Sequence, residues 1–559
     1  MKKILAMLLA IVMICSLFVG CNPADPTNPT GGNEPNPTGG ATPTGGVTPT
    51  EPQPFKNTDI YPLAGDHNLD MAVIIENPNE SHFLGIFEEA TGVNMNYQTV
   101  TKEQMPLLVA GGASTMPDII FATLSTSGLS VNQINEYGYG GAIINYADYL
   151  DKMPNLKAAI EKNPLLTSAV ADINGNFYTL PQDVFTLTSA GTMVYMRADH
   201  LAAAGWNEAP KTVEEFRQCL RDLEATFGAT DPDYIAFAPY QASHMKYSGN
   251  LTKALFPSFG DLYEPGLTIT KDQKTVAAGF ASEQYKRYVT YMNELYEEGL
   301  LDPNCFTSKG DFMKGFINDG HNSISSLLIY LQPEHFASGK NEVIIAAPLT
   351  SEYKTESEWL MPNRYSAWCC LISSDCEDLD AALAFVDALY AEPDNPIDDE
   401  GTVFGVCLWL GKFGRDWAWV EEGVSYVQLW PEDKYASRSE YDAGKGFGTA
   451  PYIGYFPYVV VDKAGNAAMK PVQVQKNLIP NVVENMYITA LKLTEDEYDI
   501  YVDAWADIDA YVTQMHASFI TGEVDIETGW ANFLKTLDNM GLQDVLSVYQ
   551  AALDRYNAK

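Results

Sequence analysis

Apolar and polar positions alternate along the chain in a rhythm that predicts strands and helices in turn. Short apolar runs predict strands at 70–76, 93–100 and 116–122. Between these runs, apolar residues on one helical face predict helices at 83–91 and 102–110, each followed by glycine. This alternation is typical of a sheet that is covered by helices on both faces, the α/β class.

The pattern changes further along the chain, where long helices become frequent. Asn174-Gly175 predicts a two-residue hairpin turn between strands at 171–173 and 176–180. Two threonines followed three residues later by glutamate, Thr212 and Thr494, have the form of capping boxes. The predicted helices are 212–223, 282–298, 379–390, the stretch after Thr494 with an apolar stripe to Met515, 527–539 and 543–556. The chain is therefore expected to end in helices only.

The N-terminus has the pattern of a secretory signal. Lys2 and Lys3 precede an uncharged apolar run at 4–19, which is too short for a spanning helix and ends in small residues. Cys21 follows directly and resembles the lipidated cysteine of the bacterial lipobox, although Phe18 stands where leucine is preferred. We therefore expect residues 1–20 to be a lipoprotein signal peptide and Cys21 to carry the lipid. The alternative is an ordinary secreted protein that is cleaved elsewhere.

Residues 21–55 contain little besides proline, threonine, glycine and asparagine after the cysteine. Such a stretch has no apolar periodicity to bury, so it is expected to be a disordered tether. A tether behind a lipidated cysteine would let a globular domain at 56–559 stand off the outer face of the cell membrane.

Composition and charge exclude several classes of function. The formal net charge of −39 opposes binding to nucleic acid or to anionic surfaces. Zinc, HExxH, GxSxG and nucleotide-loop motifs are absent, so no catalytic residue, metal or cofactor is predicted. The sequence leaves open a pair of glycosidase-type carboxylates. It also leaves open the pairing of six cysteines of the mature chain, which show no CxxC spacing: Cys219, Cys305, Cys369, Cys370, Cys376 and Cys407.

An ordered set of segments carries a family resemblance over nearly the whole chain after the tether. It comprises residues 87–93, 107–120, 174–181, 194–199, 291–303, 519–526 and 549–556. These segments resemble the family 1 extracellular solute-binding proteins, and 291–303 is particularly similar to the LplA-like lipoprotein subfamily of carbohydrate ABC importers. Many members carry a calcium loop after the helix that here begins at Thr212. Residues 224–234 offer too few oxygen ligands for such a loop, so calcium is not expected.

The resemblance implies a two-lobed periplasmic-binding-protein type II fold with a helical C-terminus. Lobe 1 is expected at about 56–185 and 366–400, and lobe 2 at about 190–365 and 401–559. The chain would cross between the lobes near 181–189 and near Tyr365, and the last helices would pack on lobe 2. The implied function is that of a monomeric substrate-binding subunit, which captures an oligosaccharide or related sugar between the lobes and delivers it to an ABC permease.

Sugar recognition needs aromatic platforms together with amide, hydroxyl and charged groups. In α/β lobes these groups lie on loops at the carboxyl ends of strands. The ligand-binding residues expected on this basis are Glu76, Asn77, Ser125, Thr126, Gln182, Tyr240, Gln241, Tyr330, Arg364, Tyr365, Trp368 and Trp409. For each tryptophan, a place in the core competes with a place in the site.

Two other functions fit the same signals. An anchored carbohydrate-active enzyme would share the signal, the tether and the aromatic content, but it needs two carboxylates that converge in the cleft. A sensor subunit would use the same binding fold to present its ligand to a signalling receptor.

Overall fold

A computed structural model of the chain describes residues 56–57, 60–75, 78–187, 193–239, 241–308, 324–329, 343–445, 454–456, 458–461 and 469–558. The predicted signal peptide, Cys21 and the tether lie outside these residues. No described helix is both long and apolar enough to cross a membrane.

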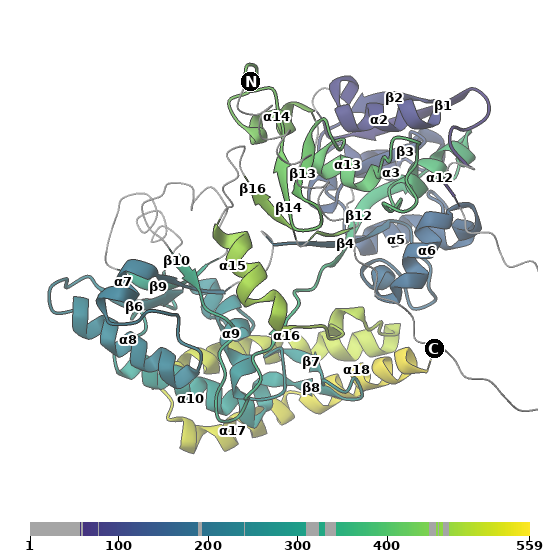
Figure 1. The fold of residues 1–559 in the computed structure, drawn as a ribbon. Coiled ribbons are helices and arrows are strands. Elements are labelled where there is room, and N and C mark those ends of the chain that lie inside the picture. Colours follow the sequence, from purple (N-terminus) through teal and green to yellow (C-terminus); the bar gives the residue numbers. More distant parts are fainter. Residues whose placement is uncertain are drawn as a thin grey trace, which may run out of the picture. The chain divides into compact units, whose positions relative to one another are not determined.

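The first sheet has six strands in the order β15-β4-β12-β3-β1-β2 (Figure 1). Strands β1, β2 and β3 are parallel, whereas β12 runs antiparallel to both β3 and β4. The bounds are β1 His67–Val73, β2 Val93–Thr99, β3 Ile119–Thr123, β4 Leu180–Thr186, β12 Tyr365–Ile372 and β15 Gly454–Phe456. The three strands predicted near the N-terminus are present, with β1 beginning three residues earlier than expected.

Both faces of this sheet are buried, because successive side chains of a strand point to opposite faces. Val73 and Cys370 belong to one apolar core, whereas their neighbours Ala72 and Cys369 belong to another. The helices of this first lobe are α2 His82–Thr91, α3 Met105–Ala110, α4 Leu124–Ser127, α5 Val131–Tyr139, α6 Pro154–Lys162 and α12 Leu379–Ala388. Helix α3 begins later than predicted, and Pro106 lies in its first turn, where proline is tolerated.

The second lobe is built on a four-stranded sheet in the order β10-β5-β9-β6. Its strands are β5 Met193–Arg197, β6 Ile235–Pro239, β9 Ile324–Ile329 and β10 Val343–Ile345. Its helices are α7 Ala198–Ala203, α8 Val213–Phe227, α9 Asn250–Leu255 and α10 Glu283–Glu297. Thr212 and Ser282 cap α8 and α10 through their hydroxyl oxygens, which accept backbone N–H bonds.

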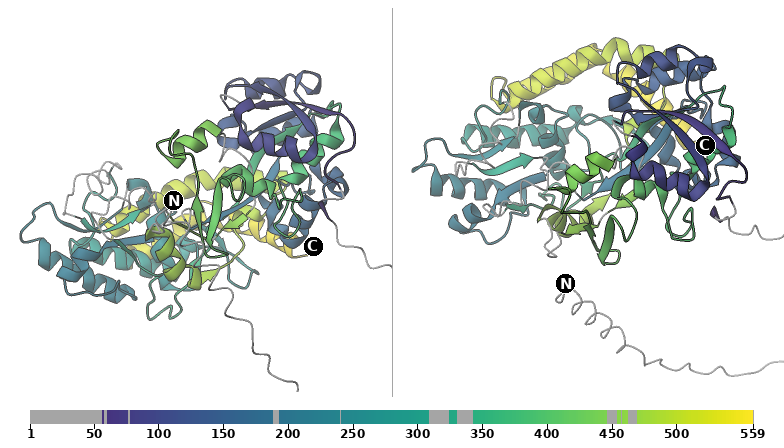
Figure 2. Two further views of the ribbon diagram at one scale, coloured as in Figure 1. Left: turned by 45° about the horizontal axis from the view of Figure 1, so that its top comes forward. Right: turned by 90° about the horizontal axis from the view of Figure 1, so that it is seen from above.

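The chain ends in the helices α16 Glu495–Ile520, α17 Ile526–Asn539 and α18 Leu542–Asn557. Thr494 and Glu497 form the predicted capping box of α16. Val512, Phe519 and Phe533 belong to the same apolar core as Phe216 and Phe237 of the second lobe. Figure 2 shows the long α16 beside the helices of this lobe, with which it shares that core.

The segment after residue 400 differs from the expected lobe boundary. Lobe 2 was expected to resume at about residue 401, but Phe404 and Tyr441 lie in a core of the first sheet. The ring of Phe404 lies 5.5 Å from that of Phe87 in α2 and 6.0 Å from that of Phe385 in α12. This aromatic contact holds the segment on the first lobe. The segment contains α13 Phe404–Leu410, β13 Trp417–Glu421, β14 Ser425–Gln428 and α14 Arg438–Lys445. Strand β16 Val459–Val461 pairs with β14 but shares an apolar core with Tyr195 and Ile345 of the second lobe.

The predicted hairpin at Asn174-Gly175 is a turn without strands on either side. The Asp172 carboxylate accepts hydrogen bonds from the backbone N–H groups of Asn174 and Asn176, at 2.8 and 2.9 Å. Gly175 takes a left-handed φ of 87°, as the turn requires. The dipeptide therefore predicted the turn correctly, but regular strand structure begins only at Leu180.

Several further short elements lie in the described residues. The other strands and the other α-helix there are β7 Leu267–Ile269, β8 Val276–Ala278, β11 Trp359–Leu360, β17 Val482–Val483 and α15 Met469–Asn477. The 3₁₀ helices are η2 Pro78–Glu80, η3 Ala113–Thr115, η4 Tyr146–Lys152, η5 Pro164–Ala169, η6 Ala242–Met245, η7 Phe256–Phe259, η8 Gly279–Ala281, η10 Ile479–Asn481 and η11 Ile488–Ala490. Cys219, Cys305, Cys369, Cys370 and Cys376 are free thiols. The side chain of Cys407 lies outside the described residues.

Candidate ligand-binding site

Strand register brings the predicted residues of the first lobe to one edge of its sheet. Thr123, the last residue of β3, pairs with Trp368 of β12, and Tyr365 of β12 pairs with Asp183 of β4. Tyr365 comes three residues before Trp368 in β12, so Tyr365 and its partner Asp183 lie beyond the carboxyl end of β3. The predicted residues at this edge are Ser125, Thr126, Gln182, Arg364 and Tyr365.

The same edge is where the chain enters and leaves the first lobe. Strand β4 runs outward from it toward β5 of the second lobe, and β12 returns to it from the second lobe. In the second sheet, Met193 at the start of β5 lies opposite Ile329 at the end of β9, and Pro239 at the end of β6 pairs with Leu328. The connection from β4 to β5 therefore runs from the edge of the first sheet that holds Gln182 to the edge of the second sheet from which Tyr240 and Gln241 follow β6.

Ser125 and Thr126 are exposed at the start of the short helix α4. Thr123 caps this helix, and its hydroxyl lies 2.8 Å from the Ser125 hydroxyl and 2.7 Å from the Thr126 hydroxyl. The Lys102 ammonium donates to the Ser125 carbonyl at 2.9 Å. These contacts hold two hydroxyl groups in fixed positions beside the end of β3.

Arg364 is the charged centre of this edge. Its Nε lies 2.8 Å from Asp183 Oδ1, and its Nη1 lies 3.6 Å from Glu484 Oε1. The Arg364 and Asp183 side chains are only 14% and 13% exposed, whereas Glu484, directly after β17, is 67% exposed. The guanidinium carbon also lies 5.5 Å from the centre of the Tyr365 ring. One cation is thus shared by two carboxylates.

The surroundings of Asp183 are polar but largely closed to solvent. The Asn163 amide donates to Tyr365 Oη at 3.0 Å and to Asp183 Oδ2 at 3.4 Å. Asp183 Oδ1 is buried and accepts no aligned hydrogen bond from the described residues. Burial raises the pKa of Asp183 to about 6, although the charge of Arg364 acts in the opposite direction.

Gln182 and Gln241 offer amide groups near these edges. Gln182 is half-buried, and its Oε1 accepts a bond from the Ser366 hydroxyl at 3.1 Å. Gln241 follows β6 and is half-buried, and its carbonyl accepts a bond from the backbone of His244 at 2.9 Å. Tyr240 lies outside the described residues, as do Glu76, Asn77 and Tyr330.

Trp368 does not reach the site, because its side chain is 6% exposed and belongs to a core of the first sheet. Its ring packs 6.2 Å from that of Phe121. The aromatic character of this position therefore serves packing. Trp409 lies in α13, with its side chain outside the described part.

Sequence reasoning missed two residues of the cluster, Asn163 and Glu484. Asn163 caps η5 through its side-chain oxygen, which accepts from the backbone of Leu165 at 3.2 Å. An asparagine before proline signals a turn, but it gives no indication of contact with a distant strand. Glu484 follows a two-residue strand, which is too short to leave a periodic signal.

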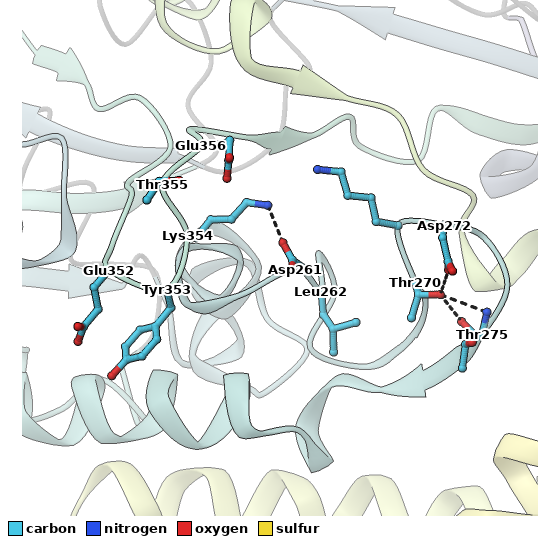
Figure 3. Close-up of a pocket in the computed structure, with 11 residues that line it drawn as sticks. Asp261, Leu262, Thr270, Asp272, Thr275, Glu352, Tyr353, Lys354, Thr355 and Glu356 are labelled. Atoms are coloured by element: carbon cyan, nitrogen blue, oxygen red, sulfur yellow. Dashed lines mark hydrogen bonds and ion pairs between the residues drawn. The ribbon is translucent and has the colours of Figure 1, made fainter.

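A separate cavity of about 880 Å³ lies within the second lobe, between the turn after β7 and residues 352–356. Lys354 is 4% exposed, and its ammonium lies 3.0 Å from Asp261 and 2.7 Å from Glu358. Figure 3 shows Lys354 pointing toward Asp261, with Thr270 and Asp272 on the facing turn. Lys271 also pairs with Glu358, at 2.8 Å. Lys271 and Lys354 are thus both paired with carboxylates of the same lobe.

Among the described residues, no group of three His, Cys, Asp or Glu residues could hold a metal ion.

The chain is similar in sequence and fold to substrate-binding proteins of ABC transporters. No protein-family model matches the chain. A fructooligosaccharide ABC transporter substrate-binding protein, FusA of Streptococcus pneumoniae, is 24% identical over 502 residues, which cover 86% of this chain and 88% of FusA.

Solved structures show the same fold. A solute-binding protein of Bifidobacterium longum infantis, described as binding HMO, matches with a TM-score of 0.64 and 19% identity, over 88% of this chain and 99% of its own. FusA in complex with kestose matches with a TM-score of 0.59 and 21% identity, over 88% and 99% of the two chains. The chain therefore has the two-lobed α/β fold of the solute-binding proteins of ABC transporters, as predicted. The proteins that it resembles are substrate-binding proteins and not enzymes.

Proposed function

We propose that this protein is the substrate-binding subunit of an ABC importer, held on the outer face of the cell membrane by a lipid, and that it captures an oligosaccharide between its two lobes. Its similarity to FusA along most of both chains supports this function. So does the fold that it shares with the solute-binding protein described as binding HMO.

One observation carries the proposal. The register of β12 with β3 and β4 gathers hydroxyl, amide and charged groups at the sheet edge from which the crossover runs. A ligand that touches this edge and the corresponding edge of the second sheet stabilises the closed arrangement of the lobes through contacts that the open arrangement lacks. Binding and closure are then one coupled event.

The chemistry of the edge suits a sugar. Ser125 and Thr126 present hydroxyl groups, and Gln182 presents an amide that both donates and accepts hydrogen bonds. A sugar offers hydroxyl groups that also do both. Such paired hydrogen bonds fix the orientation of a bound ligand.

The anchor and the permease complete the proposed transport step. Cys21 would be the lipidated N-terminus, and the tether at 22–55 would let the lobes reach a membrane permease that receives the ligand. Changing Cys21 to serine should release the chain from membranes. An unmodified N-terminus elsewhere in membrane-bound protein would contradict the anchor. The subunit is proposed to act as a monomer, outside the cell, with ATP hydrolysed by another subunit.

Titration calorimetry of the full chain carrying Cys21→Ser tests the site, with a panel of oligosaccharides as ligands. Gln182→Ala and Arg364→Ala should each weaken binding of whichever glycan binds. Matched controls are Gln218→Ala and Arg221→Ala, which change exposed residues on the outer helix α8. Unchanged affinity in both site variants would refute the site.

The same titration separates the alternative functions. Shortened glycan in the recovered sample would favour an enzyme, and Asp183 and Glu484 would be the carboxylates to test first. If the glycan stays intact, import and sensing are distinguished by the neighbouring genes, because a permease pair favours import and a membrane kinase favours sensing.

A further inference from the structure

The charges around Arg364 bear on which sugars the site can accept. Arg364 is largely buried, and two carboxylates already contact its guanidinium, Asp183 at 2.8 Å and Glu484 at 3.6 Å. The charged groups in contact around Arg364 are therefore one cation and two carboxylates among the described residues. An arginine in this position would otherwise be the natural partner of an acidic sugar, because its planar fork matches a carboxylate.

An anionic ligand would meet three unfavourable effects here. It would have to compete with Asp183 for a guanidinium that is already paired at short distance. Its charge would lie close to Asp183 and Glu484 in a partly buried region, where like charges are weakly screened. It would also approach a chain with a formal net charge of −39, which slows the association of anions.

A neutral sugar meets none of these effects, and it brings a group that the cluster can use. The Glu484 side chain is 67% exposed. A sugar hydroxyl can donate a hydrogen bond to its carboxylate, whereas an ionised carboxylate has no proton to donate.

We infer that this site selects neutral, hydroxyl-rich oligosaccharides and rejects those that carry a carboxylate, and that Asp183 and Glu484 set this selectivity by occupying Arg364. The inference rests on the proposed function and narrows its ligand class. It assigns Asp183 a role in specificity, in addition to its place in the crossover strand β4.

The test compares matched pairs of ligands on the full chain carrying Cys21→Ser. The probes are neutral di- to tetrasaccharides and, for each, the analogue in which one primary alcohol is oxidised to a carboxylate. Calorimetry at pH 7.5 should show binding of a neutral member and affinity for its acidic analogue that is lower by about tenfold or more. Equal or tighter binding of the acidic analogue would overturn the inference and leave the proposed function intact. If no probe gives a heat of binding, the result counts against both the inference and the proposed function.

Two variants test the assigned residues by a gain of binding. Asp183→Asn keeps the shape of the side chain and removes its charge, so it should raise the affinity for the acidic analogue relative to the neutral sugar. Glu484→Gln should act in the same direction, and at 67% exposed this residue can be changed without disturbing the fold. Asp380→Asn in α12 is the control, since it removes the same charge from an exposed position. The measured quantity is the ratio of the affinity for the acidic analogue to the affinity for the neutral sugar. If this ratio changes equally in all three variants, or in none, the roles of Asp183 and Glu484 are overturned.

Discussion

Arg364 and Asp183 form an ion pair that links the two adjacent strands by which the chain crosses between its lobes. The 2.8 Å contact joins the residue immediately before β12 to the middle of β4, and both side chains are largely buried. Tyr365 and Asp183 are also register partners. The pair therefore fixes the two crossover strands to one another where they leave the first sheet.

Breaking this pair from one side should be costly. Arg364→Gln leaves the Asp183 carboxylate buried without its cation, so we expect a loss of about 3–5 kcal/mol in the free energy of unfolding at pH 7. The double variant Arg364→Gln/Asp183→Asn removes both charges and should recover part of that loss. Urea unfolding of the two single variants and the double variant measures the coupling. Strictly additive losses would show that the two residues do not stabilise each other.

Asp387 should make stability depend on pH. It is 1% exposed and accepts hydrogen bonds from the backbone of Asn155 and Leu156 at the start of α6, at 2.8 and 3.0 Å. Burial raises the pKa of Asp387 to about 7, and the hydrogen bonds from Leu156 and Asn155 oppose this shift.

Because the folded state holds the Asp387 proton more tightly than the unfolded state, the contribution of this group is greatest below pH 4. It is lost as the pH rises toward 7, by up to about 4 kcal/mol. Urea unfolding at pH 5 and pH 8 gives the free energy of unfolding at each pH. The difference between the two values should be smaller in Asp387→Asn than in the wild type. The same pH dependence in both proteins would contradict the assignment.

The sequence predicted most of the elements whose signals are local. The cap at Thr494 and the glycine after α2 lie where they were expected, because capping depends on a few neighbouring residues. The sequence did not reveal that Phe404 packs on Phe87 of α2, a contact that joins residues more than 300 positions apart. Periodicity carries no information about such distant pairs.

The place of the candidate residues in the fold was predictable in the same measure. Strand ends pointed to Gln182 and Arg364, and strand register brings these residues to one edge. The pairing of Arg364 with Glu484 and the burial of Trp368 depend on tertiary packing, so no pattern of spacing could reveal them.

The cap of the longest described helix should contribute measurably to stability. The Thr494 hydroxyl accepts a bond from the Glu497 backbone, and the Glu497 carboxylate accepts one from the Thr494 backbone at 2.8 Å. Thr494→Ala should lower the free energy of unfolding by about 1 kcal/mol. Thr536→Ala inside α17 is the control, because its hydroxyl bonds only to the carbonyl of Asn532 at 2.8 Å within the helix. An equal effect of both changes would argue against a special role for the cap.

Trp368 should matter for stability and not for affinity. Replacing it with alanine removes a large buried side chain that packs on Phe121, so we expect the free energy of unfolding to fall by about 3–5 kcal/mol. Trp368→Phe keeps an aromatic ring and should lose less. Calorimetry of Trp368→Phe with a bound glycan should give the wild-type affinity. A loss of affinity in a variant that remains folded would place Trp368 in the site after all.

The most direct test of the account is the distance between the lobes with and without ligand. Spin labels on Glu161→Cys in α6 and Gln218→Cys in α8 report that distance by double electron–electron resonance. Cys21, Cys376 and Cys407 are each changed to serine, which leaves four cysteines that are buried. Saturation with a neutral oligosaccharide that binds in calorimetry should shift the distance distribution to one narrow population, and Gln182→Ala should need more ligand for the same shift. An unchanged distribution at saturation would contradict the claim that the ligand is captured between the lobes.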